Sequence, residues 1–294
     1  MRRVKKTLLI AIFSFALTLF LSAEAQSRAD SSGSLSLRLY GGLNYLNADE
    51  FNQGLAGWLD LWGQTAALLG LPGKTNFVGA HWGPQAGADL LIPLDSRLAL
   101  GLGAGTLNAS ATSQTDFPSN DVVPSSHEIK VRPWAVQLRA GLHYLVPVSD
   151  GLDIRFQAGA AYYLARAEAE YNRDWSDYWE KDRYSLKSRG WGYQGGMGLE
   201  LRLIRWAAVF LEGQYRSARI SDFSGSVEIT SSEEGLIRRE GELYIIDYKL
   251  TEDAVFSFID VLAQEPSGPA FLSVKKAVVD FSGFSLNLGL TLKF

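Results

Sequence analysis

Eight stretches of the chain alternate between apolar and polar residues, and this alternation predicts eight β-strands. Successive side chains of a strand point to opposite faces, so each stretch would carry one apolar face and one polar or glycine-bearing face. The last stretch is the clearest, because every even position over residues 284–294 is Phe or Leu, whereas the odd positions are Ser, Asn, Gly, Thr and Lys. The predicted strands cover residues 35–45, 81–92, 97–107, 131–146, 152–164, 191–203, 207–216 and 284–294.

The connections between these stretches alternate in length. Three are short, at residues 93–96, 147–151 and 204–205. The other four are long, at residues 46–80, 108–130, 166–190 and 217–277. Short turns at one end and long loops at the other are typical of up-and-down transmembrane barrels.

Aromatic residues gather at both ends of the predicted strands, on the apolar face. Aromatic rings prefer the headgroup level of a membrane, so two such groups indicate two interfaces. The long-loop group is Tyr45, Trp82, Trp134, Tyr162, Trp191 and Tyr215, and the short-turn group is Tyr144, Trp206 and Phe294.

This set of features resembles the outer-membrane β-barrels of bacteria, and in particular the small OmpX, OmpW and OmpA-membrane-domain group. The resemblance implies an all-β, antiparallel, transmembrane up-and-down barrel of eight strands, with short periplasmic turns and long extracellular loops. It also implies a location in the bacterial outer membrane, with both termini in the periplasm and lipid as the surrounding partner. The terminal aromatic residue, Phe294, resembles the signal that the barrel-assembly machinery reads in this family.

A ten-strand barrel is the alternative to eight. Residues 226–230 and 242–250 have the composition of strands and could form a hairpin in the last long connection. Charged Glu242, Asp247 and Lys249 flank or interrupt the second segment, and a charge facing lipid is costly near the bilayer midplane. We therefore expect this hairpin to extend a loop outside the membrane.

The first residues predict export. Four basic residues precede an apolar run that ends at Ala23-Glu24-Ala25, the pattern of a secretory signal peptide over residues 1–25. Residues 26–34 would be a periplasmic lead-in, and residues 35–294 a single barrel domain. The chain has no cysteine, which excludes disulfides and cysteine-based metal sites. After removal of the signal peptide, 24 basic and 31 acidic residues remain, and this acidic balance argues against nucleic acid as a partner.

The polar face of the predicted strands carries seven charged residues that would point into the lumen. An eight-stranded barrel is just wide enough for its own side chains, and buried charges must be paired. We expect an ion-pair network that fills the lumen; the alternative is an ion pathway or gate. The seven residues are Arg38, Asp89, Arg139, Arg155, Glu200, Glu212 and Arg216.

Candidate catalytic residues are few. Of the three histidines, His81 lies at the rim of the second strand, His127 in a long loop and His143 towards the short-turn end. Ser125, Ser126 and Glu128 flank His127, but sequence neighbours seldom form a catalytic triad. We therefore expect no catalytic residue, no metal site and no cofactor.

Two long loops carry candidate contact residues. Apolar residues recur at helical spacing over residues 54–69, which predicts a short amphipathic helix with Trp58 and Trp62. Such a helix could lie on the outer leaflet, cap the barrel mouth, enter the lumen or pack on other loops. A second loop mixes charges with Trp175, Tyr178 and Trp179. Mixed aromatic and charged surfaces suit recognition of an extracellular ligand or an envelope partner.

The sequence thus favours a non-enzymatic surface protein whose loops contact a ligand or partner. A narrow channel for small apolar solutes, as in OmpW, is the alternative. An outer-membrane lipid-modifying enzyme comes third.

Overall fold

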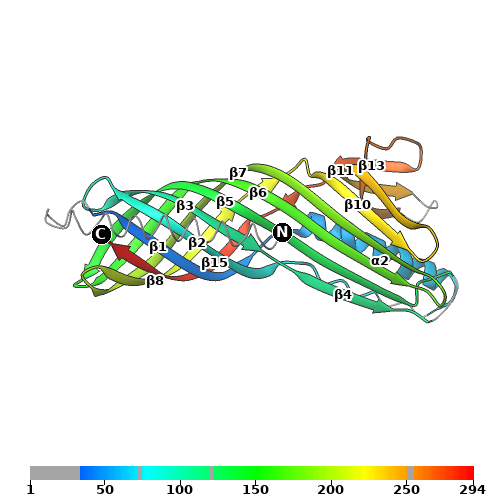
Figure 1. The fold of residues 1–294 in the computed structure, drawn as a ribbon, viewed down its shortest axis with the longest axis horizontal. Helices are drawn as coiled ribbons and strands as arrows, with labels where there is room; N and C mark the ends of the chain where they lie inside the picture. Colours follow the sequence, from blue (N-terminus) through cyan, green and yellow to red (C-terminus); the bar gives the residue numbers. More distant parts are fainter. Residues whose placement is uncertain (1–33, 72–74, 119–121, 250–254) are drawn as a thin grey trace.

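Eight antiparallel strands close into a ring in the computed structural model, which describes residues 34–71, 75–118, 122–249 and 255–294. Each strand pairs with the next along the chain order below, and β15 pairs with β1 to complete the circle. Figure 1 shows the ring as the cylinder at the end of the molecule that carries the C-terminus. Its strands are β1 (Ser36–Tyr45), β2 (Trp82–Pro93), β3 (Leu98–Asn108), β5 (Ser126–Ser149), β6 (Leu152–Asp174), β7 (Trp179–Ile204), β8 (Ala207–Ser217) and β15 (Gly283–Lys293).

The predicted all-β antiparallel architecture is confirmed, but the predicted total of eight strands is wrong. The described residues form fifteen strands, because the long connections that we expected to be loops contain strands of their own. These are β4 (Ala111–Asp116), β9 (Arg219–Ile220), β10 (Ser224–Ser231), β11 (Gly235–Lys249), β12 (Val255–Leu262), β13 (Phe271–Lys276) and β14 (Val279–Asp280). The predicted signal peptide, residues 1–25, lies outside the described residues.

The additional strands build a second half of the molecule, which we call the extension. It consists of the helix α2 (Asp49–Leu68), strands β4 and β9–β14, and the ends of β5, β6 and β7 beyond the ring. Strand β10 pairs with the first part of β7, β11 pairs with β10, and β12 and β13 flank β11. The hairpin that the ten-strand alternative would insert into the barrel therefore lies beside β7 in the extension.

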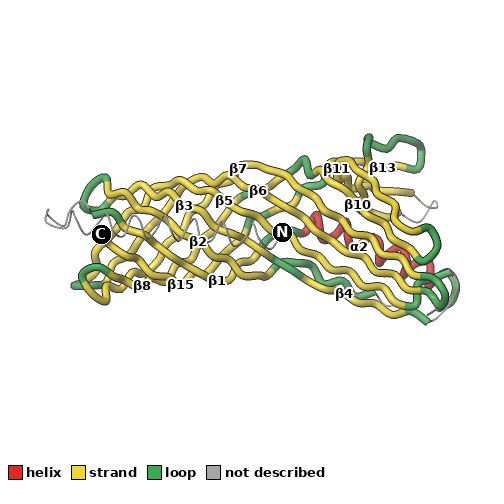
Figure 2. The backbone as a smooth tube through the Cα atoms, in the orientation of Figure 1, coloured by secondary structure: helices red, strands yellow, loops and turns green. Residues whose placement is uncertain are grey.

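Three strands pass from the ring into the extension without a break. Strands β5, β6 and β7 have 24, 23 and 26 residues, whereas a tilted strand needs about 9–11 residues to cross a bilayer. Figure 2 shows them running the length of the molecule, with α2 behind them at the far end.

The polarity of the two faces inverts where these strands leave the ring. In the ring part of β6, outward Phe156 and Leu164 are apolar and exposed, whereas inward Arg155 is charged and buried. Beyond Leu164, even-numbered residues still point outward and odd-numbered residues inward. However, outward Arg166 is charged, and inward Ala167 is apolar and buried. The same inversion occurs on β5 and β7, at Trp134 and Trp191. The surroundings that suit the ring are therefore apolar, and those that suit the extension are aqueous.

The apolar core of the molecule lies in the extension, where α2 packs inside the curved sheet. The predicted helix at residues 54–69 lies largely within α2. Gly54 and Gly57 face β12 so closely that a Cβ atom at Gly57 would lie 1.7 Å from the Ser257 carbonyl oxygen. The indole Nε1 of Trp58 donates to the Ile259 carbonyl at 3.2 Å, on the same strand. Glycine at these two positions is what lets the helix backbone approach the strand.

The helix is also fixed at its first turn and on its opposite side. Glu50 forms ion pairs with Lys275 at 2.6 Å and Arg219 at 3.5 Å, and a carboxylate near a helix N-terminus is favoured by the helix dipole. The buried Tyr171 hydroxyl of β6 donates to the Leu55 carbonyl at 3.2 Å. Among the described residues, no helix is both long and apolar enough to span a membrane.

Candidate functional site

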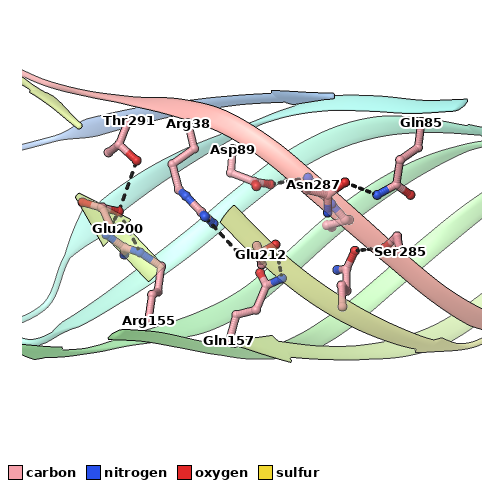
Figure 3. Close-up of polar contacts among 12 residues, drawn as sticks. Arg38, Gln85, Asp89, Arg155, Gln157, Glu200, Glu212, Ser285, Asn287 and Thr291 are labelled. Carbon is pink, nitrogen blue, oxygen red and sulfur yellow. Dashed lines mark hydrogen bonds and ion pairs between the residues drawn. The ribbon is translucent and has the colours of Figure 1, made fainter. Parts of the chain in front are cut away.

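The interior of the ring contains the seven charged residues that the sequence predicts for the lumen. They come from six strands. Strands β1, β2, β5, β6 and β7 each contribute one charged residue, and β8 contributes two. All seven side chains are buried, and the most exposed, Asp89 and Arg139, have only 7% of their surface accessible. Figure 3 shows the central part of this set.

Six of the seven charges form three ion pairs between different strands. Arg38 contacts Glu212 at 2.9 Å, and Arg139 contacts Asp89 at 2.6 Å. Arg155 contacts Glu200 through two nitrogens at 2.7 and 3.2 Å. Such pairs compensate the loss of hydration that each charge would otherwise suffer in the interior.

Uncharged polar groups extend the network. Gln157 donates to Glu212 at 2.8 Å, and Thr291 donates to Glu200 at 3.2 Å. Nearer the extension, Gln85 donates to the side chain of Asn287. Strand β15 thus contacts one ion pair through Thr291 and the Gln85 amide through Asn287.

Arg216 has no carboxylate partner within 4 Å among the described residues. Its guanidinium donates instead to the side chains of Gln85 at 3.2 Å and Ser285 at 3.1 Å. It also donates to the carbonyl oxygens of Phe281 at 3.3 Å and Tyr45 at 3.2 Å. Arg216 thus ties the end of the ring to the start of the extension.

Two aromatic rings fill space between the charges. The Arg38 guanidinium carbon lies 3.8 Å from the centre of the Phe210 ring, and that of Arg139 lies 4.9 Å from the centre of the Tyr40 ring. Planar guanidinium groups stack favourably on such rings. The paired side chains are almost inaccessible to water.

A second buried polar cluster lies in the extension. His127 is fully buried against the Tyr171 ring, and neither ring nitrogen has a hydrogen-bond partner. Burial and the nearby Arg173 lower the His127 pKa to about 3. Arg173 contacts Glu180 at 2.5 Å and also contacts Asp182. Burial raises the Asp182 pKa to about 6, even though Arg173 acts in the opposite direction.

The predicted loop-contact residues form two groups in the extension. Trp58 anchors α2 and packs on Phe258, with ring centres 4.9 Å apart. Trp62 packs edge-on against Trp175 at 6.0 Å, and Trp175 packs against Tyr178 at 5.2 Å. A pocket of about 450 Å³ lies next to these two rings. It is lined by Val122, Trp175, Ser176, Asp177, Tyr178 and Glu233. Trp179 is 44% exposed on β7.

An apolar pocket of about 400 Å³ lies between α2 and strands β11–β13. Half of its lining residues are aromatic, and no local sequence pattern indicates the pocket, because these residues are far apart along the chain. The residues that surround it include Trp58, Ile246, Tyr248, Phe256, Phe258 and Phe271.

The histidines do not form a catalytic arrangement in the described part of the chain. His81 stacks on Tyr45 and contacts Asp49 at 3.7 Å and the Leu46 carbonyl at 2.9 Å, but it contacts no hydroxyl. His143 is buried in the lumen. No group of three or more metal-ligating side chains occurs among the described residues.

Comparison with known proteins gives similarity at the level of solved structures. No family model matches the sequence, and no curated protein is similar to it. The outer membrane protease OmpT from Escherichia coli shares 10% identity at a TM-score of 0.30, over 90% of this chain and 95% of that one. A TodX mutant, a monoaromatic hydrocarbon channel, shares 11% identity at a TM-score of 0.19, over 90% and 91%. A FadL homologue of Pseudomonas aeruginosa shares 8% at 0.15, over 90% of each chain. These structure neighbours are outer-membrane β-barrel proteins, but at such TM-scores the likeness carries no argument about activity.

Proposed function

We propose that this chain is an integral outer-membrane β-barrel of bacteria with a closed lumen and a folded extracellular half that contacts a ligand or an envelope partner. The observation that carries the proposal is the set of buried ion pairs across the ring, at Arg38, Arg139, Arg155 and their carboxylate partners. An open pathway would need hydrated charges along it. The paired and buried charges leave the extension as the part that meets other molecules.

The membrane location rests on the chain's own pattern. The ring exposes leucines and other large apolar residues outward, including Leu138, Leu199 and Leu288. Three aromatic pairs stand near the level where polarity inverts: Tyr45 with Trp82, Tyr162 with Trp191, and Tyr215 with Phe284. An apolar band bounded by aromatic rings suits a bilayer. The short turns would then face the periplasm.

A non-enzymatic role is part of the proposal. His127 is buried without a partner, and His81 contacts a carboxylate and a carbonyl but no nucleophile. General-base catalysis of acyl transfer needs a nucleophile within hydrogen-bonding reach of the base.

Single-channel recording of the refolded mature chain in a planar bilayer tests the closed lumen. We expect a silent bilayer, with insertion verified by heat-modifiable gel migration. Arg139→Ala should create intermittent conductance, because it removes a side chain that fills the lumen and leaves Asp89 without its partner. Arg132→Ala, on the outward face of the extension, is the matched control and should stay silent. Stable conductance steps in the parent protein would contradict the proposal.

The second candidate function is the binding or passage of small apolar solutes, and the apolar pocket near Trp58 is the observation that favours it. The refolded protein should then bind naphthalene, with energy transfer from tryptophan as the signal. Phe258→Ser should abolish this binding if the pocket is the site. Naphthalene binding that Phe258→Ser leaves unchanged would remove the support for this candidate.

A further inference from the structure

A groove of about 710 Å³ lies on the outer surface at the junction of the ring and the extension. Strand β8 pairs with β7 up to Tyr193, and β10 begins to pair with β7 at Lys187, so the edge of β7 lacks either neighbour between these residues. Residues 217–223 cross this gap. The groove is lined by Leu164, Ala165, Arg166, Lys187, Ser188, Arg189, Asp222 and Ser224.

Three cations stand together in this groove, and we call them the basic triplet: Arg166, Lys187 and Arg189. Arg166 and Lys187 are directly opposite each other in the β6–β7 pairing, and Arg189 is opposite Leu164 on the same outward face. All three are exposed. Like charges directly opposite each other destabilise a sheet unless an anion lies between them.

Further from the ring, several cations of this outward face are paired with carboxylates, whereas the triplet is not. Glu170 contacts Lys181 at 3.2 Å and Arg183 at 2.9 Å, and Glu128 contacts Lys130 at 2.8 Å. The triplet forms no ion pair with any described residue.

Two carboxylates next to the triplet, Glu168 on β6 and Asp222 in the groove lining, have other partners. Glu168 accepts a hydrogen bond from the Trp134 indole at 3.3 Å, and Asp222 contacts Lys276 at 3.1 Å. Three cations therefore stand beside one carboxylate without an ion pair, Glu168, and one that is paired with Lys276, Asp222, which leaves a local excess of positive charge.

The triplet also lies at a defined level of the molecule. The guanidinium carbon of Arg166 lies 5.0 Å from the centre of the Trp134 ring. Leu164, two residues closer to the ring of strands, is the first apolar residue of the outward face. Tyr162 and Trp191, in contact at 5.1 Å, come next towards the ring. If the aromatic rings mark the interface, the cations lie where the phosphates of the outer leaflet lie.

We propose that the basic triplet binds the phosphate of an outer-leaflet lipid headgroup, whose acyl chains run along the apolar surface below Leu164. The proposal rests on the membrane location argued above. A phosphate between Arg166 and Lys187 would relieve their repulsion, and a guanidinium can donate two parallel hydrogen bonds to it. The ring surface would hold the acyl chains, so that affinity would require both parts of the lipid.

Native mass spectrometry of the full refolded protein, released from micelles containing lipid A, tests this proposal. The variant Arg166→Gln/Lys187→Gln/Arg189→Gln should retain lipid A on the order of a hundredfold more weakly than the parent, because each cation near an anionic headgroup adds a similar increment of affinity. Lipid A without its phosphates should bind the parent protein as weakly as intact lipid A binds the triplet variant. The control Lys130→Gln/Lys181→Gln/Arg183→Gln removes three cations from the same face and should retain lipid A normally.

The outcomes separate this inference from the membrane location. Equal lipid retention in the triplet variant and the control would overturn the inference. Complete displacement of lipid A by millimolar inorganic phosphate would overturn the lipid assignment and identify free phosphate as the ligand. Heat-modifiable migration is measured for every variant, and a parent protein that fails to insert into bilayers would instead contradict the proposed function.

Discussion

At the scale of single residues, the extension contains two groups whose pKa values shift in ways that oppose each other. His127 has a lowered pKa, so its contribution to stability is complete above its ordinary value of 6.5 and is lost as the pH falls towards about 3. Asp182 has a raised pKa, so its contribution is complete below its ordinary value of 3.8 and is lost as the pH rises through about 6. Between about pH 4 and 6 the two effects compensate.

Removal of either ionisable group should reveal the pH dependence of stability that the other group causes. In Asp182→Asn, the extension should lose stability by up to about 1.4 kcal/mol per pH unit, relative to the parent, as the pH falls from 6 to 4. His127→Phe should show the opposite slope, since neither ring nitrogen has a partner to lose. The chain has no cysteine, so a dye on Gln64→Cys in α2 can report urea unfolding of the extension alone. Parallel pH profiles in both variants and the parent would contradict this account.

The alternation of the sequence assigns the seven charges to one strand face but does not give their pairing. Their inward position follows from period-two alternation, which needs no knowledge of the neighbours. The contact of Arg38 with Glu212 joins residues on strands that are not adjacent, β1 and β8 being separated by β15. Such a contact depends on barrel closure and stagger, and neither is written in any one strand.

At the scale of elements, the position of α2 depends on two glycines. Gly57→Ala would place a Cβ atom against a carbonyl oxygen of β12, which cannot move without breaking the β11–β12 pairing. We expect the extension to lose about 1–3 kcal/mol, the usual effect of overpacking, while the ring remains intact. Urea unfolding reported by the dye on α2 is the measurement.

Gly63→Ala is the matched control for this prediction. Its Cβ would meet only the Thr75 side-chain methyl, which can rotate away, and alanine favours the helix by about 1 kcal/mol over glycine. A loss of stability in Gly63→Ala as large as in Gly57→Ala would show that close approach to β12 is not the reason.

The ring parts of the eight strands could be predicted from sequence, whereas the strands of the extension, including the far ends of β5, β6 and β7, could not. The predicted strand at residues 152–164 stops where β6 continues to Asp174, because its apolar residues change face after Leu164. The alternation itself persists, with Ala165, Ala167 and Ala169 inward. A search for alternation of either polarity would have found this segment. The long-range pairing of β11 with both β12 and β13 has no such local signal.

At the scale of the whole molecule, the outward face of the ring should tolerate charge according to depth. Leu199→Arg, in the middle of the apolar band of β7, should destabilise the refolded protein by roughly 2–4 kcal/mol, whereas Leu203→Arg, next to the short turn, should have an effect of about 0–1 kcal/mol. Both leucines are about half exposed, so burial within the protein does not distinguish them. Unfolding from lipid vesicles in urea measures the difference. Equal effects at the two positions would mean that the surroundings of the ring do not vary with depth.

The unbroken passage of β5, β6 and β7 through both halves has a consequence for reach. Because these strands are continuous and hydrogen-bonded through both halves, no hinge separates the ring from the end of the extension near Trp175 and Tyr178, and the distance between them is fixed. From the rise and tilt of barrel strands, this end lies on the order of 30 Å beyond the rings of Trp134 and Trp191. In the orientation that we propose, an extension of this length would hold its end clear of the headgroups, and an epitope inserted in the turn at residues 232–234 would be displayed at a constant distance from the membrane.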